Sequence, residues 1–125
     1  MNDKQLEQKK HELREEMRAQ GFGWINCTYV KPPKKYRQME KELSCIGMIN
    51  SLLAYNCAHM RTAEEIMQYE ENAYHNYLED YVKELGRNKV LELIQGQLDS
   101  KQGVATNVYT DSEGLSYNSI IWKEV

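Results

Sequence analysis

The feature that most constrains the fold is a long helical period that begins after two adjacent prolines, Pro32 and Pro33. From Lys34 or Lys35 onward, large apolar residues recur at steps of three and four, which places them on one face of a helix. These residues are Tyr36, Met39, Leu43, Ile46, Ile49, Leu52 and Leu53. The breadth of this face predicts a buried helix.

Residues 2–20 are nearly all good helix formers, and Gly21 follows as the expected C-terminal cap. Leu6, Leu13 and Met17 are the only large apolar residues in this stretch. Because a stripe this narrow anchors a helix weakly, we expect residues 1–20 to form a charged helix at the surface or toward another subunit.

A capping box at Thr62-Ala63-Glu64-Glu65 predicts the start of a third helix, with Thr62 accepting from the backbone of Glu65 and Glu65 reaching back. The helical register then continues to a break near Gly86 through Ile66, Tyr69, Ala73, Tyr74, Tyr77, Leu78, Tyr81 and Leu85. After that break, Asn88 is expected to cap a fourth helix whose apolar face holds Val90, Leu91, Ile94 and Leu98.

Two segments have β character. Residues 22–30 are rich in aromatic and β-branched residues and predict a strand that ends at the prolines. Residues 103–125 predict a hairpin, because Asp111-Ser112-Glu113-Gly114 fits a type I turn closed by a bulge. The predicted fold class is therefore α+β, with about four helices and a small antiparallel sheet in which the strand near 22–30 joins the C-terminal hairpin.

The C-terminal hairpin has two apolar faces. If Asp111 lies opposite Leu115, one face presents Tyr109, Leu115, Tyr117 and Ile121, and the other presents Val104, Val108, Ile120 and Trp122. The helices can cover one face only. We expect a symmetric dimer, built partly on this sheet, to cover the other.

Length and composition predict one small domain over residues 1–125: the charged helix 1–20, a strand plus helical core over 22–102, and the hairpin 103–125. The formal net charge is −3, with basic and acidic residues interspersed, which disfavours direct binding to nucleic acid. Since no apolar run is long enough to span a bilayer and no signal peptide is recognisable, we expect a soluble protein of the cytoplasm.

The reactive residue types form no recognisable catalytic or metal-binding pattern. Cys27, Cys45, Cys57 and His59 lack the spacing of a structural zinc site, so neither a metal nor another cofactor is predicted. The carboxylates around His75 on the third helix, Glu70, Glu71, Glu79 and Asp80, are interpreted as its solvated face. With no activated nucleophile and no glycine-rich phosphate loop, the prediction is that the protein is not an enzyme.

Tyrosine is the unusual component, with nine residues against a single phenylalanine. Tyrosine is enriched where a surface is buried part of the time, at protein interfaces or ligand pockets, although the edge of a core is an equally good interpretation. The predicted binding residues are Tyr74, Tyr77 and Tyr81 in a row on the third helix, with Tyr109, Tyr117 and Trp122 on the hairpin.

The last third of the chain resembles a group of known sequences. Its most specific pieces are Tyr109-Thr110-Asp111, Glu113-Gly114 and Tyr117-Asn118-Ser119-Ile120, preceded by YVKELGRNKVLELIQGQ. This ending is similar to the C-termini of small, uncharacterised accessory proteins encoded by phages and mobile elements of gut Firmicutes. The resemblance implies a protein that binds a host macromolecule, such as an anti-CRISPR-like inhibitor of a bacterial defence nuclease.

Two functions of different classes are therefore expected from the sequence. The first is a non-enzymatic protein that binds a host protein through exposed aromatic residues. The alternative is a small-molecule or nucleotide-binding protein, or an enzyme, with a pocket between the hairpin and the tyrosine-bearing helix. A flat aromatic patch favours the first function, whereas a pocket with converging arginine side chains or backbone donors favours the second.

Overall fold

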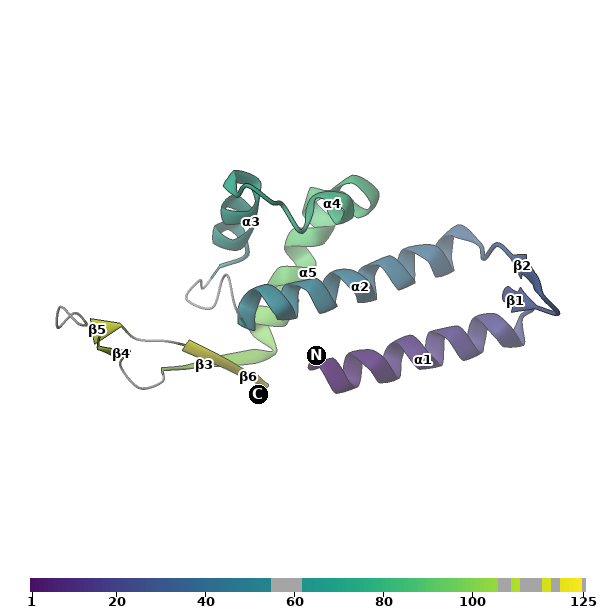
Figure 1. The fold of residues 1–125 in the computed structure, drawn as a ribbon, viewed down its shortest axis with the longest axis horizontal. Helices are drawn as coiled ribbons and strands as arrows, with labels where there is room; N and C mark the ends of the chain where they lie inside the picture. The colour runs from purple at the N-terminus through teal and green to yellow at the C-terminus, as the bar shows by residue number, and fades with distance from the viewer. Residues whose placement is uncertain (55–61, 106–108, 111–115, 118–119, 125) are drawn as a thin grey trace.

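The computed structural model describes residues 1–54, 62–105, 109–110, 116–117 and 120–124, with side chains described up to Lys101. In this part of the chain two short strands follow the first of five helices, and four more strands follow the last (Figure 1). The helices are α1 (Asp3–Ala19), α2 (Lys34–Ala54), α3 (Ala63–Asn72), α4 (Glu79–Leu85) and α5 (Arg87–Asp99). The strands are β1 (Gly23–Ile25), β2 (Thr28–Val30), β3 (Lys101–Ala105), β4 (Tyr109–Thr110), β5 (Ser116–Tyr117) and β6 (Ile120–Glu124). The α+β class is confirmed, and the fold is mostly helical.

Helices α1 and α2 run side by side as a helical hairpin whose connection is formed by β1 and β2 (Figure 1). The narrow stripe of α1 is buried, with Leu6, Leu13 and Met17 at most 6% exposed. Leu13 and Met17 pack with Tyr36 of α2 in a small apolar cluster. The stripe is therefore covered within the chain by α2.

The start of α1 is also fastened by polar contacts. The Met1 carbonyl accepts hydrogen bonds from Asn50 Nδ2 at 3.0 Å and from Gln97 Nε2 at 2.8 Å. The same Gln97 amide donates to Asn50 Oδ1 at 2.6 Å. Asn50 and Gln97 are buried, and pairing them satisfies polar groups that would otherwise destabilise the core.

The main core lies where α2, α3 and α5 meet. Its buried members are Cys45, Ile49, Leu52, Leu53, Ala63, Ile66, Met67, Leu78, Val90, Ile94 and Leu98. The helical period of residues 36–53 thus predicts α2 and most of its buried face. Met39 is an exception, since 42% of its surface is exposed at the α1 side of the helix.

The predicted third helix is two helices, which corrects the sequence-based assignment. Its start is confirmed, because Thr62 Oγ1 accepts from the Glu65 backbone N–H at 3.2 Å; the Glu65 carboxylate, however, accepts from the Thr62 hydroxyl. The helix ends at Asn72, and α4 begins only at Glu79. Helix α5 begins at Arg87 after Gly86, whose φ is 89°, and not at a cap on Asn88.

The segment 22–30 is a separate hairpin and not a third strand of the C-terminal sheet, which is a second correction. Strand β1 pairs only with β2 in the described chain, with Trp24 opposite Tyr29. The two residues between the strands, Asn26 and Cys27, have φ values of 49° and 66°. Two left-handed residues in a two-residue loop are the geometry of a type I′ turn, which lets a chain pair back on itself.

In the C-terminal region, β3 pairs antiparallel with β6 and β4 with β5 (Figure 1). Tyr109 lies opposite Tyr117, the register that follows when Asp111 lies opposite Leu115. The predicted turn, Asp111 to Gly114, falls outside the described residues, as do the hairpin side chains. A dimer formed through this sheet stays a prediction.

Candidate protein-binding surface

Two large aromatic side chains project from the β1–β2 hairpin. Trp24 is 73% exposed and Tyr29 is 54% exposed, and their ring centroids lie 5.5 Å apart with the planes tilted by 57°. They are direct cross-strand neighbours, so the register of the hairpin holds the two rings together. An exposed pair of this size on a fixed strand is unusual for a surface that meets only water.

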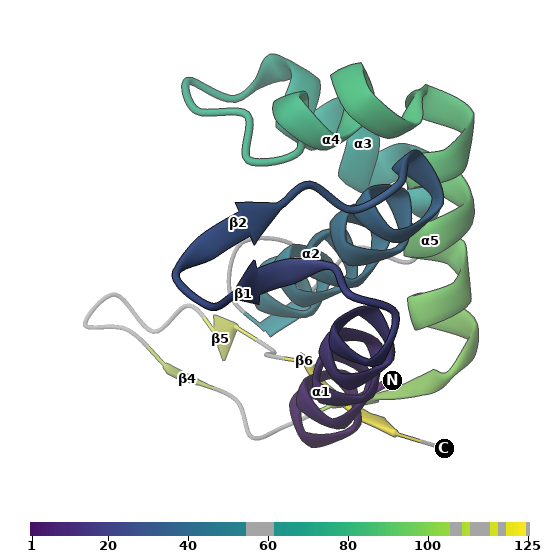
Figure 2. The same cartoon turned by 90° about the vertical axis from the view of Figure 1, so that its right-hand side faces the viewer.

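The hairpin is fixed to the helices by the residue that precedes its first strand. Phe22 donates its backbone N–H to the Met17 carbonyl at 2.9 Å, and its ring packs at 6.0 Å from the ring of Tyr36. Figure 2 shows the hairpin extending from the end of the α1–α2 pair. The position of Trp24 is therefore set by the core, not by a free loop.

A hollow of about 220 Å³ lies between the hairpin and the second half of α1. Its lining residues are Arg14, Met17, Arg18, Phe22, Gly23, Trp24, Tyr29, Pro32 and Glu40. We call the exposed residues Trp24, Tyr29, Val30, Arg14 and Arg18 the hairpin surface. Tryptophan, tyrosine and arginine are the residue types that contribute most to binding energy at protein interfaces.

The charges on the hairpin surface leave one arginine available. Arg18 pairs with Glu15 on α1 at 3.0 Å. Arg14 has no ion pair within the described part of the chain and lines the hollow beside the aromatic rings. A guanidinium next to aromatic faces can pair with a carboxylate or stack on a partner ring.

The predicted row of Tyr74, Tyr77 and Tyr81 along one helix is wrong, because only Tyr81 lies in a helix. Tyr74 and Tyr77 lie in the segment between α3 and α4, 96% and 49% exposed, and Tyr74 packs edge-on against His75 at 4.7 Å. Tyr81 is on α4, half-buried, with Lys41 Nζ 5.1 Å from its ring centroid. Tyr109, Tyr117 and Trp122 lie on β4, β5 and β6, where side chains are outside the described residues. A binding role for these six residues stays a prediction.

Glu70 is buried and not on a solvated face, contrary to the sequence interpretation. Its side chain has no exposed surface, and its Oε2 accepts the Tyr77 backbone N–H at 2.9 Å. Burial raises the pKa of this carboxyl, and the hydrogen bond from Tyr77 acts against that rise. This hydrogen bond holds the segment that carries Tyr74 and Tyr77 against α3.

The raised pKa of Glu70 predicts a pH dependence of stability. The pKa of this carboxyl is higher in the folded than in the unfolded state. Its contribution to the free energy of unfolding is therefore fully present when the pH is below the unfolded-state pKa. The contribution is lost as the pH rises through the folded-state pKa. Glu70→Gln keeps an acceptor for Tyr77 and cannot ionise. We expect the variant to gain stability relative to the parent at pH 8 and to lose that gain near pH 4, measured by urea unfolding. A gain that is constant across this range would contradict the burial of an ionisable group.

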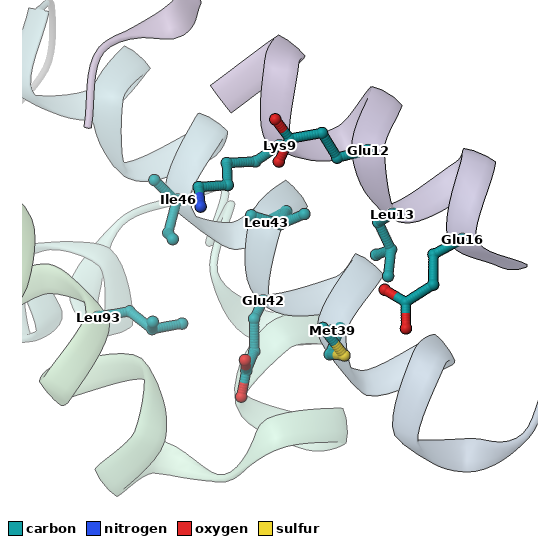
Figure 3. A pocket seen from close by; sticks show the side chains of 9 residues that line it. All are labelled: Lys9, Glu12, Leu13, Glu16, Met39, Glu42, Leu43, Ile46 and Leu93. Carbon is teal, nitrogen blue, oxygen red and sulfur yellow. The ribbon is translucent and has the colours of Figure 1, made fainter. Parts of the chain in front are cut away.

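A second hollow lies between α1, α2 and α5 (Figure 3). It has a volume of about 280 Å³ and is lined by Lys9, Glu12, Leu13, Glu16, Met39, Glu42, Leu43, Ile46 and Leu93. Two of its carboxylates are already engaged, because Glu16 accepts from the Tyr36 hydroxyl at 3.3 Å and Glu42 pairs with Lys89 at 3.4 Å. With Leu13 and Leu43 beneath the charged groups, this is an apolar groove with an acidic rim.

The described side chains hold no cluster that could bind a metal ion, and one of the two described cysteines is buried. Burial raises the pKa of the Cys45 thiol to about 12, so this cysteine stays protonated and is a core residue. Groups of three or more histidine, cysteine, aspartate or glutamate side chains placed to hold a metal are absent from residues 1–54 and 62–101. Cys57 and His59 lie outside the described residues.

The sequence contained a clue to the hairpin surface that the strand assignment missed. Asn26 is a residue that tolerates positive φ, and it stands between two triplets rich in aromatic and β-branched residues. A two-residue turn at this point places Trp24 beside Tyr29. A single strand through the same residues separates them.

Comparisons with protein-family models, with curated proteins and with solved structures found no match for this chain. The resemblance of the C-terminal third to phage and mobile-element proteins therefore stays a prediction. None of the helices in the described chain is both long and apolar enough to cross a membrane.

Proposed function

We propose that this protein is a non-enzymatic binding protein that contacts another protein through the hairpin surface. The observation that carries the proposal is Trp24, which is 73% exposed on a hairpin fixed to the core. The cost of ordering a flexible side chain on binding is small here, since the hairpin register and Tyr29 already hold the ring. Arg14, which lines the same hollow, is available for a charged contact with the partner.

The partner that we propose is a bacterial host protein, and a defence nuclease is the specific case. This finer proposal rests on the resemblance of the C-terminal third, from Tyr81 to Glu124, to phage and mobile-element accessory proteins. The chain would then act as an anti-CRISPR-like inhibitor, by occupying a surface of the nuclease.

Truncating Trp24 tests the proposal. A partner is first captured from bacterial lysate with the parent protein and identified by mass spectrometry, and its affinity is then measured with purified components. We expect Trp24→Ala to weaken binding by about 30-fold, on the order of 2 kcal/mol, which is typical of a central interface tryptophan. The free energy of unfolding should change by less than about 0.5 kcal/mol, because the side chain is exposed.

Tyr69→Ala is the matched control. Tyr69 is 41% exposed on α3, away from the hairpin, so its truncation removes an exposed aromatic side chain without touching the hairpin surface. Binding should stay within about twofold of the parent. Equal affinity of the parent and Trp24→Ala for the identified partner would reject the hairpin surface as the contact.

A further inference from the structure

The described chain has a basic hollow that the hairpin surface does not include. It lies between the start of α2 and the end of α4, with a volume of about 350 Å³. Four of its lining residues, Lys34, Arg37, Gln38 and Lys41, belong to α2, and Glu84 and Leu85 belong to α4. The α2 residues are spaced by three and four positions, so they share one face of the helix. Glu40, which lines the hairpin hollow, belongs to another face.

The positive charge of this hollow is only partly balanced. Lys41 Nζ pairs with Glu84 Oε1 at 3.3 Å and also lies over the Tyr81 ring. Lys34 and Arg37 are exposed and have no ion pair with any described residue. Lys34 and Arg37 therefore remain unpaired beside Lys41. Glu84 is the one carboxylate among the residues that line the hollow, and it already pairs with Lys41.

The position of these cations is unfavourable for the helix itself. The first turn of α2 holds no acidic residue, and it begins with Lys34 and Lys35. The N-terminal end of a helix is the positive end of its dipole, where cations destabilise and anions stabilise. An anion bound in the hollow would offset this repulsion. The placement of the cations is therefore favourable when a negatively charged ligand is bound.

We propose that this hollow binds a phosphate-bearing ligand. A phosphate group carries up to two negative charges and accepts several hydrogen bonds, which suits Lys34, Arg37 and the Gln38 amide acting together. The hollow is of the size of small-molecule sites, and Leu85 offers an apolar wall for the rest of the ligand. This site shares no residue with the hairpin surface, so the test of the phosphate site is independent of the test of the proposed protein partner.

Isothermal titration with three probes at constant ionic strength tests the site. The probes are inorganic pyrophosphate, ATP and a ten-nucleotide single-stranded oligothymidylate. We expect pyrophosphate to bind, and the double variant Lys34→Gln/Arg37→Gln to weaken that binding at least tenfold. The control Lys4→Gln/Lys9→Gln removes the same charge from α1 and should change the binding by less than twofold.

The three probes also distinguish the source of the phosphate. Tighter binding of ATP than of pyrophosphate assigns the hollow to a nucleotide-like small molecule, whereas tighter binding of the oligonucleotide assigns it to a nucleic-acid backbone. Absence of binding by all three probes at millimolar concentration would overturn the proposal, as would an equal loss in the control variant. Because Lys34 and Arg37 are exposed, circular dichroism should show a folded double variant. Its melting temperature at low salt should be no lower than that of the parent.

Discussion

Replacing Leu78 by alanine is expected to lower the free energy of unfolding by about 3 kcal/mol, measured by urea denaturation followed by circular dichroism. Leu78 is in the short segment between α3 and α4, yet its side chain has no exposed surface and belongs to the main core. Truncation would leave a cavity that is hard to close, because Ile66, Ile94 and Val90 of the same core cluster are also fully buried.

Tyr74→Ala is the control for this result. Tyr74 lies four residues earlier in the same segment and is 96% exposed, so its removal takes almost nothing from the core. We expect a change within about 0.5 kcal/mol. If Leu78→Ala also changed stability by less than about 1 kcal/mol, the segment between α3 and α4 would not be anchored as described.

Replacing Gly47 by leucine is expected to cost about 3 kcal/mol, the upper part of the range for overpacking a close contact. Gly47 is on α2 where α1 crosses it, and a Cβ at this position would meet Leu6 Cδ2 at 3.1 Å. Leu6 is itself only 3% exposed and has little space to move. The larger side chain should therefore push α1 away from α2.

Hydrogen exchange measures this separation directly, since amides of α1 should exchange faster in Gly47→Leu while those of α5 change less. Gly96→Leu is the matched control, because Gly96 is an exposed helical glycine with no atom within 4 Å of its added Cβ. That control should gain up to about 1 kcal/mol from helix propensity. Equal effects of the two leucines would show that α1 does not depend on the close approach at Gly47.

The sequence by itself determined the helices whose apolar residues repeat over many turns. The helical period of apolar residues over 36–53 predicted most of the buried face of α2. The narrow apolar stripe of Leu6, Leu13 and Met17 predicted the buried residues of α1. The start of α3 followed from Thr62 and Glu65. These features depend on contacts between residues three or four positions apart, so they can be read from one segment at a time.

Only the tertiary structure decided where the third helix breaks and where the aromatic residues lie. In the sequence, the helical register continues through Leu78. In the structure, the segment between α3 and α4 is a loop, in which the Tyr77 backbone N–H bonds to the buried Glu70 and the Leu78 side chain enters the core. In the same way, the Asn26–Cys27 turn pairs β1 with β2 and brings Trp24 beside Tyr29. The burial of the Glu70 carboxylate and the pairing of β1 with β2 depend on which surfaces meet in the folded chain. Local periodicity does not contain that information, because it describes each segment without its neighbours.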